Sequence, residues 1–169
     1  MLRPGRRRIY WDSCVWLDYI SETPENKEVL DMLLRDSAMR SGNIHLITSV
    51  IAITEVAFGA TEKANQALDD DVEQKIDSLW KDTTAVTLVE PYPAIALRAR
   101  GIIRLGIEKG WTGLRALDAI HLATAQQIEA DEFHTYDTQL HRYSEQLGFP
   151  ITAPYVHGPP SSEDKPRLL

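Results

Sequence analysis

The chain has 169 residues, of which 43% are hydrophobic and 25% are charged, a balance that is ordinary for one globular domain with one core. The formal net charge of -7 argues against a broad basic surface for nucleic acid, although a local basic site is compatible with it. Charged residues interrupt the longest apolar stretches after about a dozen residues, far short of the roughly 20 that cross a bilayer, so we expect no membrane span.

The N-terminal segment and the single cysteine favour a cytoplasmic protein. Arg6, Arg7 and Arg8 resemble the basic start of a signal peptide, but Asp12 and Asp18 follow where its uncharged segment would lie. We therefore interpret the arginines as solvated surface. Cys14 is the only cysteine and cannot form an intramolecular disulfide, so nothing calls for an oxidising compartment.

In the first half of the chain the hydrophobic pattern predicts alternating strands and helices. Strands are expected at residues 9–11 and 44–47. Helices are expected at 15–20, before Pro24, and at 25–39, with an apolar stripe of Val29, Met32, Leu33 and Met39. A further helix is expected from a cap at Thr48 or Ser49 to about residue 58, with Gly59 as its stop.

The second half of the chain continues this alternation. Residues 62–81 predict one acidic amphipathic helix with Ala67, Ile76 and Leu79 facing inward. Strands are expected at 85–89 and 132–135, with an edge strand at 151–152. Helices are expected at 92–109, 117–130 and 137–147.

Strands separated by helices predict an α/β fold, with a central, mainly parallel sheet between two helical layers. We expect a single domain over residues 1–153 and a mobile tail over 154–169, which is rich in proline and serine. Ligands of such sheets bind where the carboxyl ends of the strands meet the loops. That edge is where functional residues should be sought.

Four acids fall at positions of this kind: Asp12, Glu55, Asp118 and Asp137. Asp12, Asp118 and Asp137 each also suit a purely structural role, as a helix cap or as a complement to a helix dipole. Glu55 is harder to explain in that way, because Ile51 and Phe58 flank it on the expected helix and a buried carboxylate needs a partner.

Together, the four acids indicate a divalent cation site. Carboxylates within a few ångströms repel one another and take up protons unless a cation neutralises them. Oxygen ligands without a zinc-type spacing of cysteine and histidine favour Mg²⁺ or Mn²⁺. Such ions hold phosphate and activate water, so an acidic protein can hydrolyse an acidic polymer.

Four segments around these acids resemble the PIN-domain ribonucleases, and most closely the VapC-type toxins of toxin-antitoxin pairs. The segments are YWDSCVWLDYI, LITSVIAITEVAFGA, LRALDAIHLATAQQ and FHTYDTQL, in the family's order over about residues 8–147. The resemblance implies a three-layer α/β/α sandwich, a homodimer and a cognate antitoxin that blocks the site. It also implies that Asp12, Glu55, Asp118 and Asp137 bind Mg²⁺ or Mn²⁺ and activate water to cleave RNA.

Further residues are assigned less direct roles. By the resemblance, Ser13 and Thr135 would orient the ligands or the water. Arg98, Arg104 and Arg115 precede Asp118 and are candidates for contacts with RNA phosphates.

Several residues near these segments have a structural interpretation instead. We interpret His121 as a surface or core-edge residue, although it lies one helical turn after Asp118. We interpret Cys14 as a small buried residue and Trp111 as a packing residue.

Three other classes of protein were weighed. A haloacid-dehalogenase-like phosphatase needs a second aspartate two positions after the first, where Cys14 stands. A response-regulator receiver does not explain a glutamate inside a helix. A PIN-like module that binds RNA or protein without catalysis remains the alternative, and the intact set of four acids argues against it.

Overall fold

The structure of the protein, a computed structural model, describes residues 5–156. Its centre is a five-stranded sheet with strand order β3-β2-β1-β4-β5, in which all neighbouring strands are parallel. The strands are β1 (Arg7–Trp11), β2 (Ile44–Ser49), β3 (Val86–Val89), β4 (Glu132–His134) and β5 (Ile151–Thr152). Because the strands run in one direction, their carboxyl ends share one edge of the sheet.

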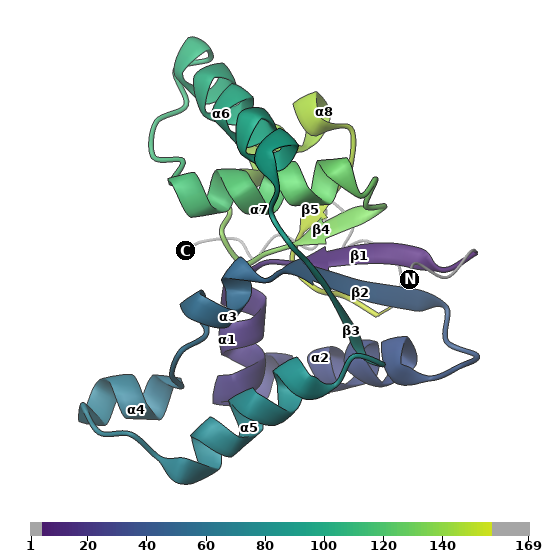
Figure 1. Cartoon of the computed structure of the whole chain (residues 1–169), viewed down its shortest axis with the longest axis vertical. Helices are drawn as coiled ribbons and strands as arrows, with labels where there is room; N and C mark the ends of the chain where they lie inside the picture. The colour runs from purple at the N-terminus through teal and green to yellow at the C-terminus, as the bar shows by residue number, and fades with distance from the viewer. Residues whose placement is uncertain (1–4, 157–169) are drawn as a thin grey trace, which may run out of the picture.

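Helices cover both faces of the sheet (Figure 1). One layer contains α1 (Ser13–Ser21), α2 (Pro24–Ala38), α3 (Ile51–Glu55), α4 (Ala60–Asn65) and α5 (Asp70–Lys81). The other contains α6 (Pro93–Glu108), α7 (Ala116–Gln127), the 3₁₀ helix η1 (Leu140–Tyr143) and α8 (Ser144–Leu147). The expected three-layer α/β/α sandwich is therefore confirmed.

Successive residues of β1 face the two layers in turn, as the twofold period of a strand requires. Ile9 and Trp11 pack into the core beneath α1 and α2, where Trp11 and Trp16 have ring centroids 4.6 Å apart. Tyr10 packs into the opposite core and stacks on Phe133 at 5.2 Å. β1 is thus buried on both faces, which explains its unbroken apolar run.

The arginines at the start of the chain bind neighbouring segments, so their interpretation as solvated surface is corrected. The Arg6 guanidinium donates to backbone carbonyls around the end of α2, among them that of Ser37. Arg7 pairs with Glu132 at 3.2 Å, and Arg8 donates to the Ile128 carbonyl at 2.9 Å. These contacts position β1 against its neighbours.

The helix expected from Thr48 or Ser49 to residue 58 is shorter than predicted. Thr48 and Ser49 belong to β2, because they pair with Leu88 and Val89 of β3. The helix α3 begins at Ile51 and ends at Glu55. Gly59 does not stop this helix and instead caps the start of α4.

The single helix expected at 62–81 is divided into α4 and α5. Gln66 takes a left-handed conformation with a φ of 51°, and the Asp69 side chain caps α5. The Glu62 carboxylate stabilises the connection by accepting the backbone N–H groups of Gly59 and Asp69. Ala67 lies in this connection and is exposed, so its expected inward position is wrong.

The apolar stripe expected on the helix at 25–39 is partly wrong. Leu30 and Leu33 are buried, whereas Met32 and Met39 are exposed. No helix within residues 5–156 is long and apolar enough to cross a membrane. Of the expected tail at 154–169, residues 157–169 lie outside the described part of the chain.

Candidate active site

Asp12 directly follows β1 and is the N-cap of α1. Its carboxylate accepts the Cys14 backbone N–H at 3.0 Å and the Val15 N–H at 3.4 Å, and the Cys14 thiol donates to it at 2.8 Å. The residue is only 6% exposed. Burial raises the pKa of the Asp12 carboxyl, and hydrogen bonds from Cys14 and Thr135 offset part of this effect. A cation near this buried carboxylate would offset the cost of its charge.

Glu55 is the last residue of α3, on the segment that leaves β2. Its Oε2 lies 2.5 Å from Nε2 of His121 on α7, so the two helices are connected across the edge of the sheet. The flanking residue Phe58 is partly exposed and lies beyond the helix. The interaction with His121 explains the partial burial of the carboxylate better than the apolar neighbours do.

Asp118 is in the first turn of α7 and forms a bidentate ion pair with Arg115. The guanidinium donates to both carboxylate oxygens at 2.9 Å, and the Arg115 backbone N–H donates to Oδ2 at 3.2 Å. The Asp118 carboxylate raises the pKa of Arg115, with smaller contributions from Glu55 and Asp137. The Arg115 guanidinium is therefore within electrostatic range of three of the four candidate acids.

Asp137 lies in the loop after β4, where its Oδ1 accepts the Gln139 N–H at 2.9 Å. Thr135 connects this loop to Asp12, because its hydroxyl accepts the Asp137 N–H at 3.0 Å and lies 3.4 Å from the Cys14 sulfur. Ser13 is the first residue of α1. Of the two candidate orienting hydroxyls, Thr135 thus has contacts that fit the role, whereas the Ser13 hydroxyl has no hydrogen bond to a candidate acid in the described structure.

The oxygen donors of these four residues fit Mg²⁺ or Mn²⁺ chemically, but they do not form a preassembled cage. Within residues 5–156, no three side chains of the His, Cys, Asp or Glu types lie together as a ready metal site. Asp12, Glu55 and Asp118 are instead bound to a thiol, an imidazole and a guanidinium, respectively. Ion binding at Asp118 would require the guanidinium to leave.

The three candidate RNA-binding arginines lie at different distances from this edge. Arg104 lines a shallow cavity together with Ala116 at the start of α7. Arg98 instead donates to Gln126 and Gln127 at the far end of α7. Since each helical residue advances about 1.5 Å, Gln126 is roughly 12 Å along the axis from Asp118.

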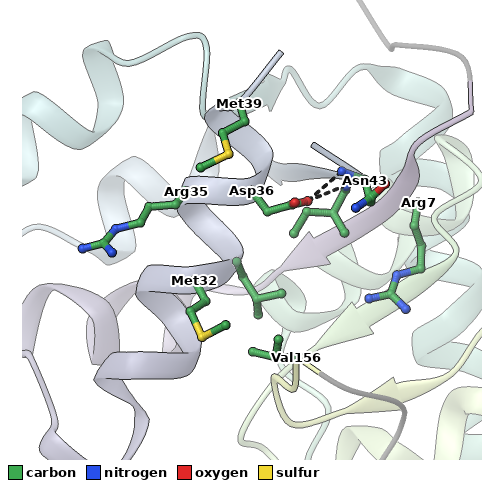
Figure 2. Close-up of a pocket in the computed structure, with 9 residues that line it drawn as sticks. Arg7, Met32, Arg35, Asp36, Met39, Asn43 and Val156 are labelled. Atoms are coloured by element: carbon green, nitrogen blue, oxygen red, sulfur yellow. Dashed lines mark hydrogen bonds between the residues drawn. The ribbon is translucent and has the colours of Figure 1, made fainter. Parts of the chain in front are cut away.

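A larger cavity of about 640 Å³ lies at the opposite edge of the sheet, where β1 and β2 begin (Figure 2). Its lining includes Met32, Met39 and Val156, flanked by Arg7. The one acid in this lining, Asp36, accepts the backbone N–H groups of Asn43 and Ile44 at 2.8 and 2.9 Å. The cavity is therefore separate from the four candidate acids.

Two residues near the site have contacts that their structural interpretation did not include. Cys14 donates to Asp12 and accepts the Tyr136 N–H at 3.2 Å, and burial together with the Asp12 charge raises the pKa of its thiol. His121 is fully buried and contacts Glu55. Its spacing of three residues from Asp118 was the available sequence signal. Trp111 packs edge-on against Tyr143, consistent with its expected packing role.

Several solved structures have a similar fold. VapC20 of Mycobacterium tuberculosis, described as a sarcin-ricin loop cleaving toxin, is 13% identical, covering 90% of this chain and 99% of its own, with a TM-score of 0.60. VapBC2 of Rickettsia felis, bound to promoter DNA, is 12% identical over 86% of this chain and 96% of its own, with a TM-score of 0.57. FitAcB of Neisseria gonorrhoeae is 16% identical over 86% of this chain and 97% of its own, with a TM-score of 0.56.

A comparison with curated protein sequences finds no match. The PIN domain family profile, in contrast, matches residues 9–146, which include β1 and all four candidate acids. The matched residues include most of the parallel sheet. The chain therefore belongs to the PIN domain family.

Proposed function

We propose that this protein is a metal-dependent endoribonuclease that hydrolyses RNA phosphodiester bonds. The observation that carries the proposal is the position of Asp12, Glu55, Asp118 and Asp137 around the carboxyl edge of a PIN-family sheet. A shared cation would explain why acids that repel one another lie along the same edge. The structural similarity to VapC20, a toxin that cleaves the sarcin-ricin loop, supports RNA as the substrate class.

In this proposal the four carboxylates hold Mg²⁺ or Mn²⁺, which would supply positive charge for a phosphate and activate a water. Asp12 is held in place for this task by the backbone N–H groups at the start of α1. Thr135 orients the Asp137 loop through the Asp137 backbone N–H. Ser13 is placed beside Asp12 to contact the ligands or the water.

Arg98, Arg104 and Arg115 are proposed to contact RNA phosphates to different extents. Arg115 lies on Asp118 and Arg104 near the start of α7, whereas Arg98 is bound at the far end of α7. Charge reversal should therefore weaken RNA binding most at Arg115 and least at Arg98, and should reduce the salt dependence of binding. Equal effects at all three positions, or none, would contradict this order.

We further propose that the protein is the toxin of a toxin-antitoxin pair, acts in the cytoplasm and forms a homodimer. The similarity to VapC20, VapBC2 and FitAcB supports the toxin assignment and a cognate antitoxin partner. Leu97 and Ile107 are 70% and 73% exposed on α6, which supports a further protein contact on that helix. Light scattering of the purified chain, with and without Leu97→Glu, tests the dimer.

The activity is tested with purified wild-type protein, Asp118→Asn and the matched control Asp77→Asn, each incubated with a mixed RNA pool and Mg²⁺ or Mn²⁺. Asp77 is an exposed acid on α5 that pairs with Lys81, so its substitution controls for loss of charge. We expect metal-dependent cleavage by the wild type and the control only. If folded wild-type protein neither cuts RNA nor binds Mn²⁺, the alternative of a non-catalytic binding module is favoured.

A further inference from the structure

His121 is the fully buried residue of α7 that contacts Glu55, and both of its ring nitrogens have partners. Nε2 lies 2.5 Å from Glu55 Oε2, and Nδ1 lies 2.7 Å from the Tyr10 hydroxyl. The ring therefore cannot rotate about its axis without losing a hydrogen bond in a site that excludes water. The two contacts therefore hold the His121 ring in one orientation against Glu55.

The hydrogen bonds of Tyr10 bear on which ring nitrogen of His121 carries the proton. The Tyr10 hydroxyl oxygen accepts the Ser49 backbone N–H at 3.0 Å, so its own proton is available for His121 Nδ1. When Tyr10 donates this proton to Nδ1, Nδ1 is the acceptor and Nε2 carries a proton that can be donated to Glu55. Tyr10 is itself held by stacking on Phe133 in β4.

His121 binds Oε2 of Glu55, while Oε1 of Glu55 has no hydrogen-bond partner in the described part of the protein. A carboxylate whose one oxygen is held by an imidazole N–H presents the other in a defined direction. Without that contact, the side chain at the end of a five-residue helix would sample several rotamers. Ordering the Glu55 side chain would then cost conformational entropy and weaken ion binding.

We propose that His121, supported by Tyr10, is a positioning residue that orients the Glu55 carboxylate for a divalent cation. The proposal rests on the proposed function, because it assigns Glu55 to the cation site. His121 touches neither RNA nor ion in this role and acts through Glu55. Its loss should weaken ion binding by about 10- to 100-fold, the range found for partners that orient metal ligands.

The test measures Mn²⁺ affinity by calorimetry for the wild type and for His121→Gln and His121→Asn. The glutamine amide reaches the position of Nε2 and can still donate to Glu55, whereas the shorter asparagine amide reaches only that of Nδ1. We expect Gln to retain most of the affinity and Asn to lose it. Both variants keep a polar amide, and the Glu55→Gln background separates a general loss of packing from the loss of this contact.

Two further variants separate the proposal from a structural role. Tyr10→Phe keeps the ring and its stacking but removes the donor to Nδ1, and should weaken Mn²⁺ binding several-fold. In a Glu55→Gln background, His121→Asn should no longer change the affinity, because the contact through which it acts is gone.

The outcomes are distinguishable. Wild-type protein that binds no Mn²⁺ would overturn the proposed function and with it this proposal. Wild-type binding that His121→Asn and His121→Gln reduce equally, or not at all, would overturn the positioning role and leave the proposed function standing. A loss confined to Asn that disappears in the Glu55→Gln background would establish it.

Discussion

The Arg115→Ala substitution should strengthen the binding of Mn²⁺, because in the proposed ion site Arg115 and the cation would compete for Asp118. In the metal-free protein the guanidinium occupies both oxygens of this carboxylate at 2.9 Å. An incoming ion must first break the pair, so the free energy of the pair is subtracted from that of ion binding. Removing the guanidinium also removes a positive charge that repels the ion.

The expected magnitude follows from the exposure of the pair. The Arg115 side chain is 74% exposed, which places the pair among surface salt bridges of about 0.2–1 kcal/mol. Its bidentate geometry and the low exposure of Asp118 favour the upper end of this range. About 1 kcal/mol corresponds to roughly fivefold tighter binding.

Calorimetric titration with Mn²⁺ at low ionic strength measures this difference directly. The matched control is Arg98→Ala, which removes another exposed arginine, one bound to Gln126 and Gln127 away from the site. The control should bind Mn²⁺ as the wild type does. The gain for Arg115→Ala should shrink at high salt, since screening already weakens the ion pair. Unchanged or weaker binding by Arg115→Ala would refute the competition between guanidinium and ion.

Two other predictions concern stability. Burial raises the pKa of Asp12 above its unfolded value of about 3.9, so ionised Asp12 destabilises the metal-free fold increasingly as pH rises from that value through the raised pKa. Urea unfolding without metal should therefore find Asp12→Asn more stable than the wild type at pH 7, with the difference vanishing below about pH 4; a less stable variant at pH 7 would contradict this. On α6, Gly106→Ala would bring a methyl group against the buried Tyr143 hydroxyl and should cost about 1–3 kcal/mol, whereas Gly101→Ala meets open space and should stabilise the helix by up to about 1 kcal/mol. Thermal unfolding of the two variants checks this, and equal shifts would refute the packing argument.

Much of the fold could be predicted because local pattern and tertiary structure agree. The apolar run before Asp12 reads as a buried strand, and β1 is indeed buried on both faces. Pro24 marks a helix boundary in the sequence and in the structure. The sequence pattern used it to end the preceding helix, and in the structure it also begins α2. The alternation of strands and helices was sufficient to predict a parallel sheet with two helical layers.

The errors occur where side-chain contacts override helical pattern. Residues 62–81 have an amphipathic pattern that continues through the break between α4 and α5, which the Glu62 carboxylate stabilises by accepting the N–H groups of Gly59 and Asp69. β2 extends to Ser49 because β3 pairs with it. The hydrophobic periodicity of the β2 segment alone does not indicate this pairing. Such contacts depend on which segments are neighbours and are therefore not readable from one segment alone.

The same limit applies to the candidate site. The sequence could propose all four acids as candidates, because each lies after a strand, in the helix that follows a strand, or at the start of a helix. They are Asp12, Glu55, Asp118 and Asp137. The partners of these acids could not be proposed in this way, since His121 is 66 residues from Glu55 along the chain and meets it only when α3 and α7 are side by side. The role of a histidine one helical turn after a candidate metal ligand is therefore better judged from the helices that neighbour it in the fold than from its own helix alone.

The partners of these acids also differ in how easily a cation could replace them. Asp12 is bound by a thiol and backbone N–H groups, and Glu55 by a buried imidazole, all of which belong to the folded core. The partner of Asp118 is different, because the Arg115 guanidinium is mostly exposed and can leave at little cost. In the proposed ion site, Asp12 and Glu55 would therefore be held in place before an ion arrives, and Asp118 would be the acid at which the cation exchanges with a protein charge. The released guanidinium would then be free to contact an RNA phosphate next to the ion, which makes the loss of the Arg115 pair a step toward substrate binding in the proposed ribonuclease.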